Sequence, residues 1–171
     1  MALLPILQHP DPRLRQKARP VTDFGADLQR LIDDMFETMY AAPGVGLAAT
    51  QVGVALRLAV MDASEDKSEQ VVLINPEIIE AGDRQSMEEG CLSIIDYRDT
   101  VERFNRLRMR ALDRQGQPFE VQAEGLLAQC IQHEIDHLDG KLYIDYLSAL
   151  KRERLKKKLA KEARGSRAAA R

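Results

Sequence analysis

The chain has 171 residues, of which 44% are hydrophobic and 30% charged, and its formal net charge is −2. This size and apolar content predict one domain with room for a proper hydrophobic core. No apolar run approaches the length of a membrane span, and the first residues have neither the length nor the basic region of a signal peptide, so we expect a cytoplasmic protein without membrane contact. Two cysteines cannot build a disulfide framework, which agrees with that location.

The first predicted element is a helix over about residues 25–42, where apolar side chains recur at helical spacing before Pro43-Gly44. Apolar runs follow at 56–62 and 71–80. A hairpin is predicted over about 98–124, because apolar and arginine residues alternate at 106–111 ahead of a turn near Gln115-Gly116. Helices are predicted at about 125–139 and from about Ser148. This order indicates an α+β fold, with antiparallel sheets packed around a central metal-binding helix and a basic helix at the C-terminus.

The 125–139 helix carries the most informative motif, the segment His133-Glu134-Ile135-Asp136-His137. Two imidazoles at positions i and i+4 share one helical face and can bind one metal ion, while the adjacent glutamate can exchange a proton with water at that ion. Apolar residues surround the motif on most sides, which predicts a buried helix. Buried histidine and glutamate side chains without partners would be costly, so a metal site is favoured over two surface histidines.

A catalytic metal usually has three protein ligands, and this motif supplies two. The extended metalloprotease pattern requires histidine at position 143, which is Tyr143, and His9 lies in a proline-rich stretch typical of a turn. Cys130 shares the helical stripe of the histidines. A metal between the two histidines would lie near the level of residue 135, about 7 Å from Cys130 along the axis at 1.5 Å per residue, so we expect Cys130 to line the cavity instead. Cys91, beside Gly90, stays open at this point as a ligand, a nucleophile or an inert thiol.

Three short segments then occur in the order and at the spacing of the signatures of peptide deformylases: GVGLAATQ at 44–51, EGCLS at 89–93 and QHEIDH at 132–137. The chain resembles bacterial peptide deformylases from about residue 3 to about residue 165. The first segment also satisfies the dinucleotide pattern G-x-G-x-x-A, with Asp62 about twenty residues later. That pattern requires a preceding strand, whereas a helix is predicted here, so nucleotide binding is not favoured.

The resemblance implies a hydrolase that removes the formyl group from the N-terminal formyl-methionine of nascent polypeptides and releases formate. It implies one divalent ion, iron(II) by nature, which zinc, nickel or cobalt can replace. Glu134 would act as general base and acid, and the Gln51 amide with the Leu92 backbone N–H would stabilise the developing oxyanion. The implied metal ligands are Cys91, His133 and His137.

An extended peptide is expected to pair with the Gly44-Val45-Gly46 backbone, since glycine permits close approach. The substrate methionine then needs an apolar pocket over His133, with predicted walls at Val45, Met87, Leu126 and Cys130. One departure concerns the rim of this cleft. Family members usually carry proline after the Cys-Leu-Ser-Ile run, and this chain has Ile95.

Charge is distributed unevenly, because residues 151–171 hold ten Lys/Arg and only two Asp/Glu. A solvated helix that keeps the protein soluble is one interpretation. The other is contact with a polyanion, and for an enzyme of nascent chains this would be ribosomal RNA near the exit tunnel. We expect one catalytic domain over residues 1–165, a frayed basic tail over residues 166–171, and a monomer.

Two other functions remain as alternatives. A zinc endopeptidase would need a third, carboxylate ligand, for which Glu153 and Glu162 are the downstream candidates, although both lie in the basic helix. A nucleic-acid-binding module with a structural metal would need four protein ligands, and only three credible ones are present.

Overall fold

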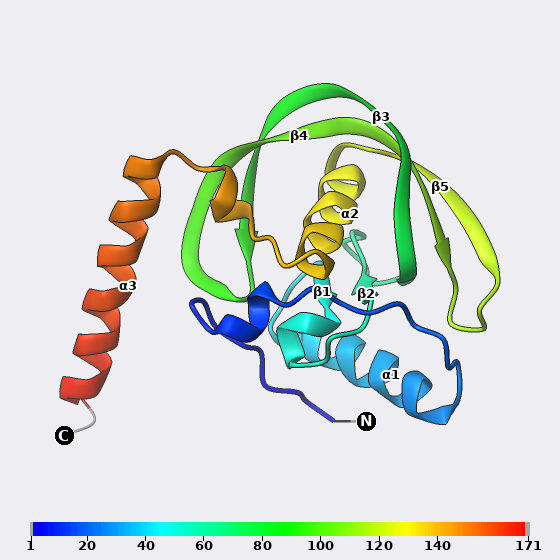
Figure 1. Ribbon diagram of the computed structural model, residues 1–171, viewed down its shortest axis with the longest axis horizontal. Helices are drawn as coiled ribbons and strands as arrows, with labels where there is room; N and C mark the ends of the chain where they lie inside the picture. Colours follow the sequence, from blue (N-terminus) through cyan, green and yellow to red (C-terminus); the bar gives the residue numbers. More distant parts are fainter. Residues whose placement is uncertain (1, 170–171) are drawn as a thin grey trace.

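The computed structural model of the protein describes residues 2–169 (Figure 1). Its helices are α1 (Ala26–Ala41), α2 (Gly125–Leu138) and α3 (Ala149–Ala169), and its strands are β1 (Gly46–Ala48), β2 (Leu58–Met61), β3 (Val71–Cys91), β4 (Ile94–Leu112) and β5 (Pro118–Glu124). Short 3-10 helices connect them: η1 (Pro12–Arg15), η2 (Ala49–Val52) and η3 (Tyr143–Tyr146).

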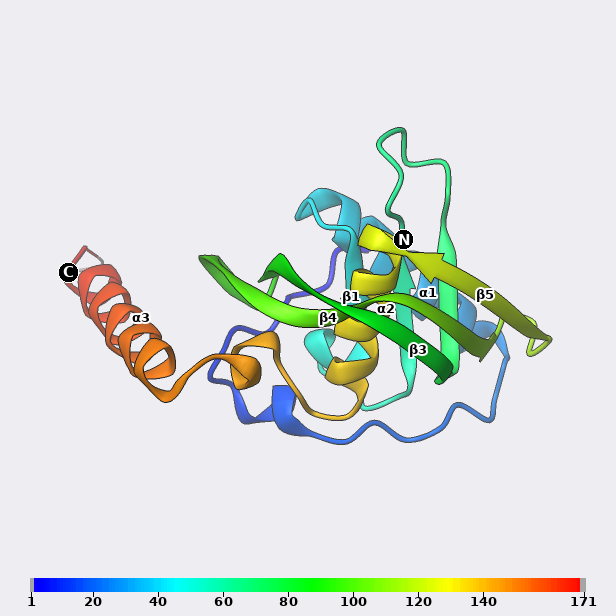
Figure 2. The same cartoon turned by 90° about the horizontal axis from the view of Figure 1, so that it is seen from above.

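Within these residues the five strands form one antiparallel sheet in the order β1-β2-β3-β4-β5. Strands β3 and β4 make a long hairpin that closes with Cys91 opposite Ile94. The register shifts at three places along this pair, between Ile74 and Glu77, between Ile78 and Glu80, and at Gly90. Such irregularities bend a strand pair, and the hairpin arches over α2 (Figures 1 and 2).

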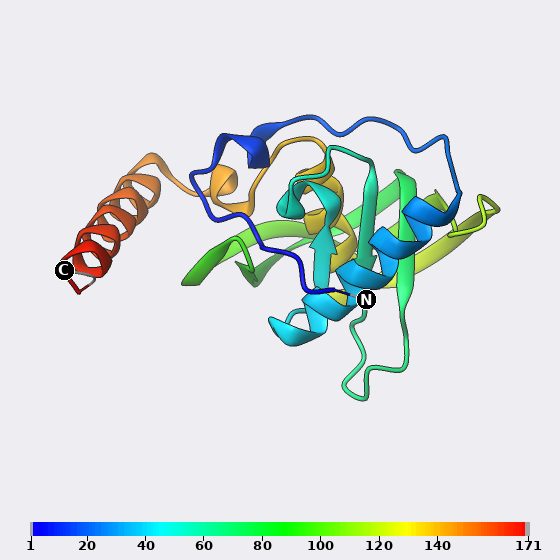
Figure 3. The same ribbon diagram turned by 90° about the horizontal axis from the view of Figure 1, so that it is seen from below.

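Helix α2 lies in the hollow of the curved sheet and contacts all five strands. Helix α1 packs on β1 and β2 instead, and Figure 3 shows it crossing those strands. Its buried side chains Ile32, Met35 and Met39 lie three or four residues apart, so one stripe of α1 faces the sheet. The buried side chains of α2, which include Ala128 and Ile131, belong to a different cluster from those of α1 and pack with residues of β3, β4 and β5. The fold therefore encloses α2 and leaves one face of α1 in solvent.

Helix α3 projects away from this body (Figure 1). It is attached near its start, where Leu155 is buried with η3 side chains and Leu159 is partly buried. None of the described helices combines the length and apolar character needed to cross a membrane. Helix α3 continues to Ala169, through positions where a frayed tail is predicted, and residues 170 and 171 lie outside the described part of the chain.

The α+β fold is confirmed. The two predicted helices before residue 140 are confirmed as α1 and α2, each within a residue or two of the predicted bounds. The β4–β5 hairpin is confirmed with its turn near Gly116, but β4 begins at Ile94 rather than near residue 98. The apolar run ending near residue 80 is only the first half of β3, which continues to Cys91. Its second half is rich in exposed charged residues, so it carries no continuous apolar signal.

Candidate metal centre

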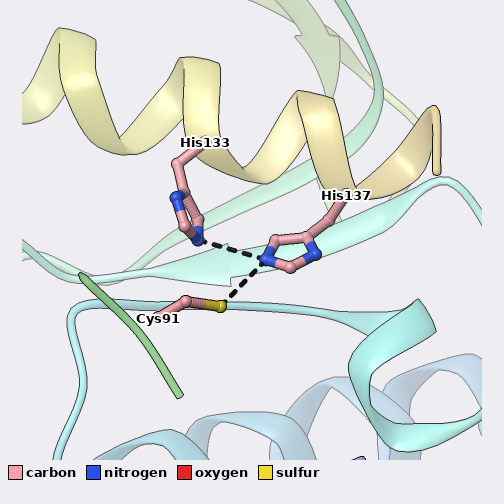
Figure 4. A group of neighbouring side chains, drawn as sticks. All are labelled: Cys91, His133 and His137. Carbon is pink, nitrogen blue, oxygen red and sulfur yellow. Dashed lines mark hydrogen bonds between the residues drawn. The ribbon is translucent and has the colours of Figure 1, made fainter. Parts of the chain in front are cut away.

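Three side chains from β3 and α2 converge beside the closed end of the β3–β4 hairpin (Figure 4). Cys91 ends β3, and His133 and His137 stand one turn apart on α2. The Nε2 atom of His137 lies 3.3 Å from the Cys91 Sγ atom and 3.1 Å from the Nε2 atom of His133. All three donor atoms lie within 4.8 Å of one another, so the thiol left open by the sequence faces the histidine pair.

This donor set fits a small divalent cation. A tetrahedral zinc ion, with metal–nitrogen distances of about 2.0–2.1 Å and a metal–sulfur distance of about 2.3 Å, places neighbouring donors roughly 3.3–3.6 Å apart. The measured separations of 3.1 and 3.3 Å lie close to those values. Cys130 is not part of the group, and burial raises the pKa of its thiol to about 12, which favours the neutral form. The prediction that Cys130 lines the cavity without binding metal agrees with both observations.

A buried ionic network holds His133 from behind. The His133 Nδ1 atom lies 2.6 Å from Glu89 Oε2, and Arg103 donates to both oxygens of that carboxylate at 3.0 and 2.6 Å. Arg103 also donates to Asp136 at 2.7 Å. Burial raises the pKa of Glu89, but the hydrogen bonds from His133 and Arg103 outweigh burial and hold it at about 2. Because Glu89 is ionised, Nδ1 carries the His133 proton, and Nε2 is left to face a cation.

This network was not predicted from the sequence, although Glu89 begins the second of the three signature segments. A signal for Arg103 was present. It has the same parity along β4 as Leu107 and Met109, which face the core, and all three are buried. A charged residue at an inward position of a strand requires a buried partner.

Glu134 lies between the metal ligands and β1, with its carboxylate against the backbone of Gly46. Its Oε1 atom is buried and has no hydrogen-bond partner among the described residues. Burial raises the pKa of Glu134 to about 7. A carboxylate with a pKa near neutrality, open to a cavity, can both accept and return a proton.

Gln51 reaches the same point from η2. Its Oε1 atom accepts a hydrogen bond from the Ala48 backbone N–H at 2.9 Å, which orients the amide. Its Nε2 atom then donates to the Ser93 hydroxyl at 3.0 Å and lies 3.6 Å from the Cys91 sulfur. Ser93, for which no role was predicted, also donates its backbone N–H to that sulfur, at 3.5 Å. Both residues therefore place N–H groups beside the thiol.

A cavity of about 430 Å³ opens over these groups, within the size range of small-ligand sites. Its floor includes His133, Glu134, Gln51 and Cys91, whereas His137 is buried behind it. Of the predicted substrate-binding residues it is lined by Gly44, Val45, Gly46, Leu126 and Cys130, and the predicted oxyanion donor Leu92 lines it as well.

Met87, which was predicted as a wall of the pocket, is the exception. It is not among the lining residues, and it pairs with Val101 along the hairpin. Met87 lies four residues before Cys91 on the same strand, which is about 13 Å at 3.3 Å per residue. Glu88, Glu89 and Gly90 supply this stretch of wall instead.

The structure also bears on the alternatives. Gly44 follows helix α1 rather than a strand, so the context of a dinucleotide site is missing. Glu153 and Glu162 are exposed on α3 and do not belong to the metal-ligand group among the described residues. His9 does not belong to it either.

Comparisons with known proteins agree with this geometry. Residues 3–153 match the family model described as polypeptide deformylase. A peptide deformylase of Azotobacter vinelandii is 60% identical over 165 residues, which are 96% of this chain and 98% of that protein. The crystal structure of a peptide deformylase from Legionella pneumophila superimposes with a TM-score of 0.92 at 54% identity, covering 96% of this chain and 97% of that one.

A second solved structure, the Ehrlichia chaffeensis peptide deformylase in complex with actinonin, has a TM-score of 0.90 at 39% identity, over 95% of this chain and 98% of that chain. The sequence match and the structural match each extend over nearly the whole chain. The chain therefore belongs to the peptide deformylase family.

Proposed function

We propose that this protein is a metal-dependent hydrolase that removes the formyl group from the N-terminal formyl-methionine of nascent polypeptides. The observation that carries the proposal is the convergence of one thiol and two imidazole nitrogens beside a buried glutamate, at the floor of an open cavity. Membership of the family supports the reaction. A relative that binds actinonin supports a ligand site in this fold.

Cys91, His133 and His137 would hold the ion. One thiolate with two imidazoles suits iron(II), zinc, nickel or cobalt, and we propose iron(II) on the strength of the family resemblance. When bound, such an ion would act as a Lewis acid and lower the pKa of a water molecule from 15.7, for zinc to about 7. The Glu89 carboxylate keeps the His133 ring in the orientation that this site requires.

Glu134 would then carry out the proton transfers, and Gln51 and Leu92 would stabilise the developing charge. Glu134 takes a proton as water adds to the formyl carbon. The formyl oxygen gains negative charge and accepts hydrogen bonds from the Gln51 side-chain amide and the Leu92 backbone N–H. The C–N bond breaks, Glu134 returns the proton to the departing nitrogen, and formate and a free amine leave. The chain is held just beyond this N–H, because the carbonyl of Leu92, in the next peptide unit, accepts a hydrogen bond from the Gln8 side-chain amide at 3.0 Å.

The peptide would enter as an added strand along Gly44-Val45-Gly46. This edge of β1 is suited to pairing, since β2 occupies only its other side. The methionine side chain would lie between Val45, Leu126 and Cys130, above His133. Val45 and Leu126 are exposed at the mouth of the cavity, as expected of residues that an apolar side chain covers.

We further propose a cytoplasmic monomer with one catalytic domain over residues 1–165. Its basic helix α3 would contact ribosomal RNA, since its charge faces solvent along most of its length. Binding to ribosomes should then weaken steeply as salt rises, because phosphate contacts release counterions. If ribosome binding does not change with salt concentration, or if no binding is found, this part of the proposal is wrong.

The deciding experiment measures formate release from formyl-methionyl peptides by protein purified without oxygen, with the metal content determined in the same samples. Formate should appear in proportion to bound metal. Internal peptides of the same length should remain intact, which separates deformylation from endopeptidase activity. Cleavage of internal bonds without formate release would overturn the assignment.

A further inference from the structure

The substrate cavity has three walls, and one of them depends on the C-terminal helix. The first wall is the segment before β1, and the second is one face of α2. The third comprises the end of β3 and the start of β4. We define residues 94–99 as the tip segment, of which Ile94, Asp96, Tyr97 and Arg98 line the cavity. Asp96 and Arg98 are exposed, so the tip segment forms the mouth of the cavity rather than its floor.

The middle of the tip segment, Ile95 to Tyr97, falls outside the strand pairing, which passes from Gly90 opposite Arg98 to Cys91 opposite Ile94. Asp96 has a φ of +60°, a left-handed conformation that non-glycine residues seldom adopt. The pairing of β3 with β4 also shifts register at Gly90, directly beside it. A segment with irregular pairing and a strained residue is held in place by contacts from outside the sheet.

Helix α3 provides such contacts. Lys158 donates from Nζ to the backbone carbonyl of Asp96 at 2.9 Å, and the same ammonium lies 5.9 Å from the centre of the Tyr97 ring. Lys151 pairs with Asp99 at 3.0 Å, and Asp99 in turn accepts the Tyr97 hydroxyl at 2.8 Å. Leu155, one turn from both lysines, is only 3% exposed. One stripe of this basic helix is therefore turned toward the tip segment.

A second contact comes from η3, where the Tyr143 hydroxyl donates to the Tyr97 carbonyl at 3.0 Å. Tyr143 is buried, and its ring centre lies 6.2 Å from that of the metal ligand His133. The tip segment is thus held both by Tyr143, next to the metal ligand His133, and by Lys158 of α3.

We propose that Lys158 is a positioning residue for the third wall, and that α3 thereby sets how the cleft accepts peptide residues beyond the formyl-methionine. This inference rests on the proposed function, since it concerns the same cavity. The methionine itself reaches the buried floor, whereas the following residues pass the exposed mouth where Asp96 and Arg98 lie. Loss of the Lys158 contacts should therefore weaken binding of longer substrates and leave the chemical step intact.

The test compares Lys158→Met, which keeps the aliphatic chain and removes the donor and the charge, with Lys158→Arg and Lys157→Met. Lys157 is exposed and points about 100° away from Lys158 around the helix, so its variant removes the same charge without removing the contacts of Lys158 with the tip segment. Two readouts are needed: kcat and KM for formyl-methionine amide and for a formyl-methionyl tripeptide, and amide hydrogen exchange of residues 94–101.

Lys158→Met should raise KM for the tripeptide roughly threefold to tenfold, with kcat within about twofold and KM for the amide unchanged. Exchange of residues 94–101 should become faster. Lys158→Arg and Lys157→Met should both keep the parental KM for the tripeptide and the parental exchange of residues 94–101. Equal KM for Lys158→Met and the parent, an equal rise for both substrates, or the same effect in Lys157→Met would each overturn the inference. If the parent protein releases no formate, the proposed function fails. Unchanged amide hydrogen exchange of residues 94–101 in Lys158→Met would refute the positioning role of Lys158 independently of that result.

Discussion

The arginine at the centre of the buried network offers the sharpest test of how the metal centre is supported. Arg103 is 4% exposed and ion-pairs with Glu89, which is 5% exposed, and with Asp136. Arg103→Met retains an apolar chain of similar length and removes the charge. Two carboxylates would then remain close together with Tyr146 as a neutral donor to one of them. We expect a large loss of stability because a buried charge without its partner is strongly unfavourable.

The magnitude follows from the burial of the pair. Removing one partner of a buried ion pair costs about 3–5 kcal/mol. For a chain of this size each kcal/mol shifts the unfolding midpoint by roughly 2–4 °C, so the midpoint should fall by roughly 6–20 °C. Glu89 would also lose the contact that fixes it against His133, and loss of such support typically lowers metal affinity by about 10–100-fold.

Thermal unfolding followed by circular dichroism measures the first effect, and competition with a chelator of known affinity measures the second. Arg106→Met is the matched control, since Arg106 lies on the same strand and pairs with Asp83 while both side chains are about 60% exposed. Exposed pairs contribute little, so its midpoint should stay close to that of the parent protein. Equal midpoints for the two variants, or unchanged metal affinity in Arg103→Met, would refute the supporting role of the network.

Three further predictions concern the reacting groups. Glu134→Gln should keep the metal and lose nearly all turnover, which metal analysis and formate release measure together; full activity would remove Glu134 from the proton transfers. Cys91→Ala should strip the metal whereas Cys130→Ala should not, and the opposite pattern in metal content would overturn the ligand assignment. Gly46→Ala would place a Cβ atom 2.5 Å from Glu134 Oε2, so the carboxylate must move. Because a displacement of about 1 Å can cost about 100-fold in rate, kcat should fall by that order with metal content unchanged, and Gly165→Ala, where a Cβ meets open space, should retain parental kcat.

The sequence by itself determined the elements whose signals are local. The i, i+4 spacing of His133 and His137 and the apolar residues around them fixed a buried helix with two ligands on one face. The periodicity of residues 25–42 and the alternation near residues 106–111 likewise depend only on neighbours along the chain. The third ligand was supported by resemblance rather than by geometry, because the sequence cannot tell whether a cysteine 42 residues before His133 points at it.

Only the tertiary structure decided which distant side chains meet. It extended β3 through a charged stretch to Cys91, and this extension brings Glu89 and Cys91 to α2 while it takes Met87 away from the cavity. It joined Arg103 to residues 14 positions before it and 33 positions after it. It also turned part of a basic helix toward the cleft. These contacts arise from the bend of the β3–β4 hairpin around α2, and a bend produced by register shifts between two strands leaves no periodic trace in either strand's own sequence.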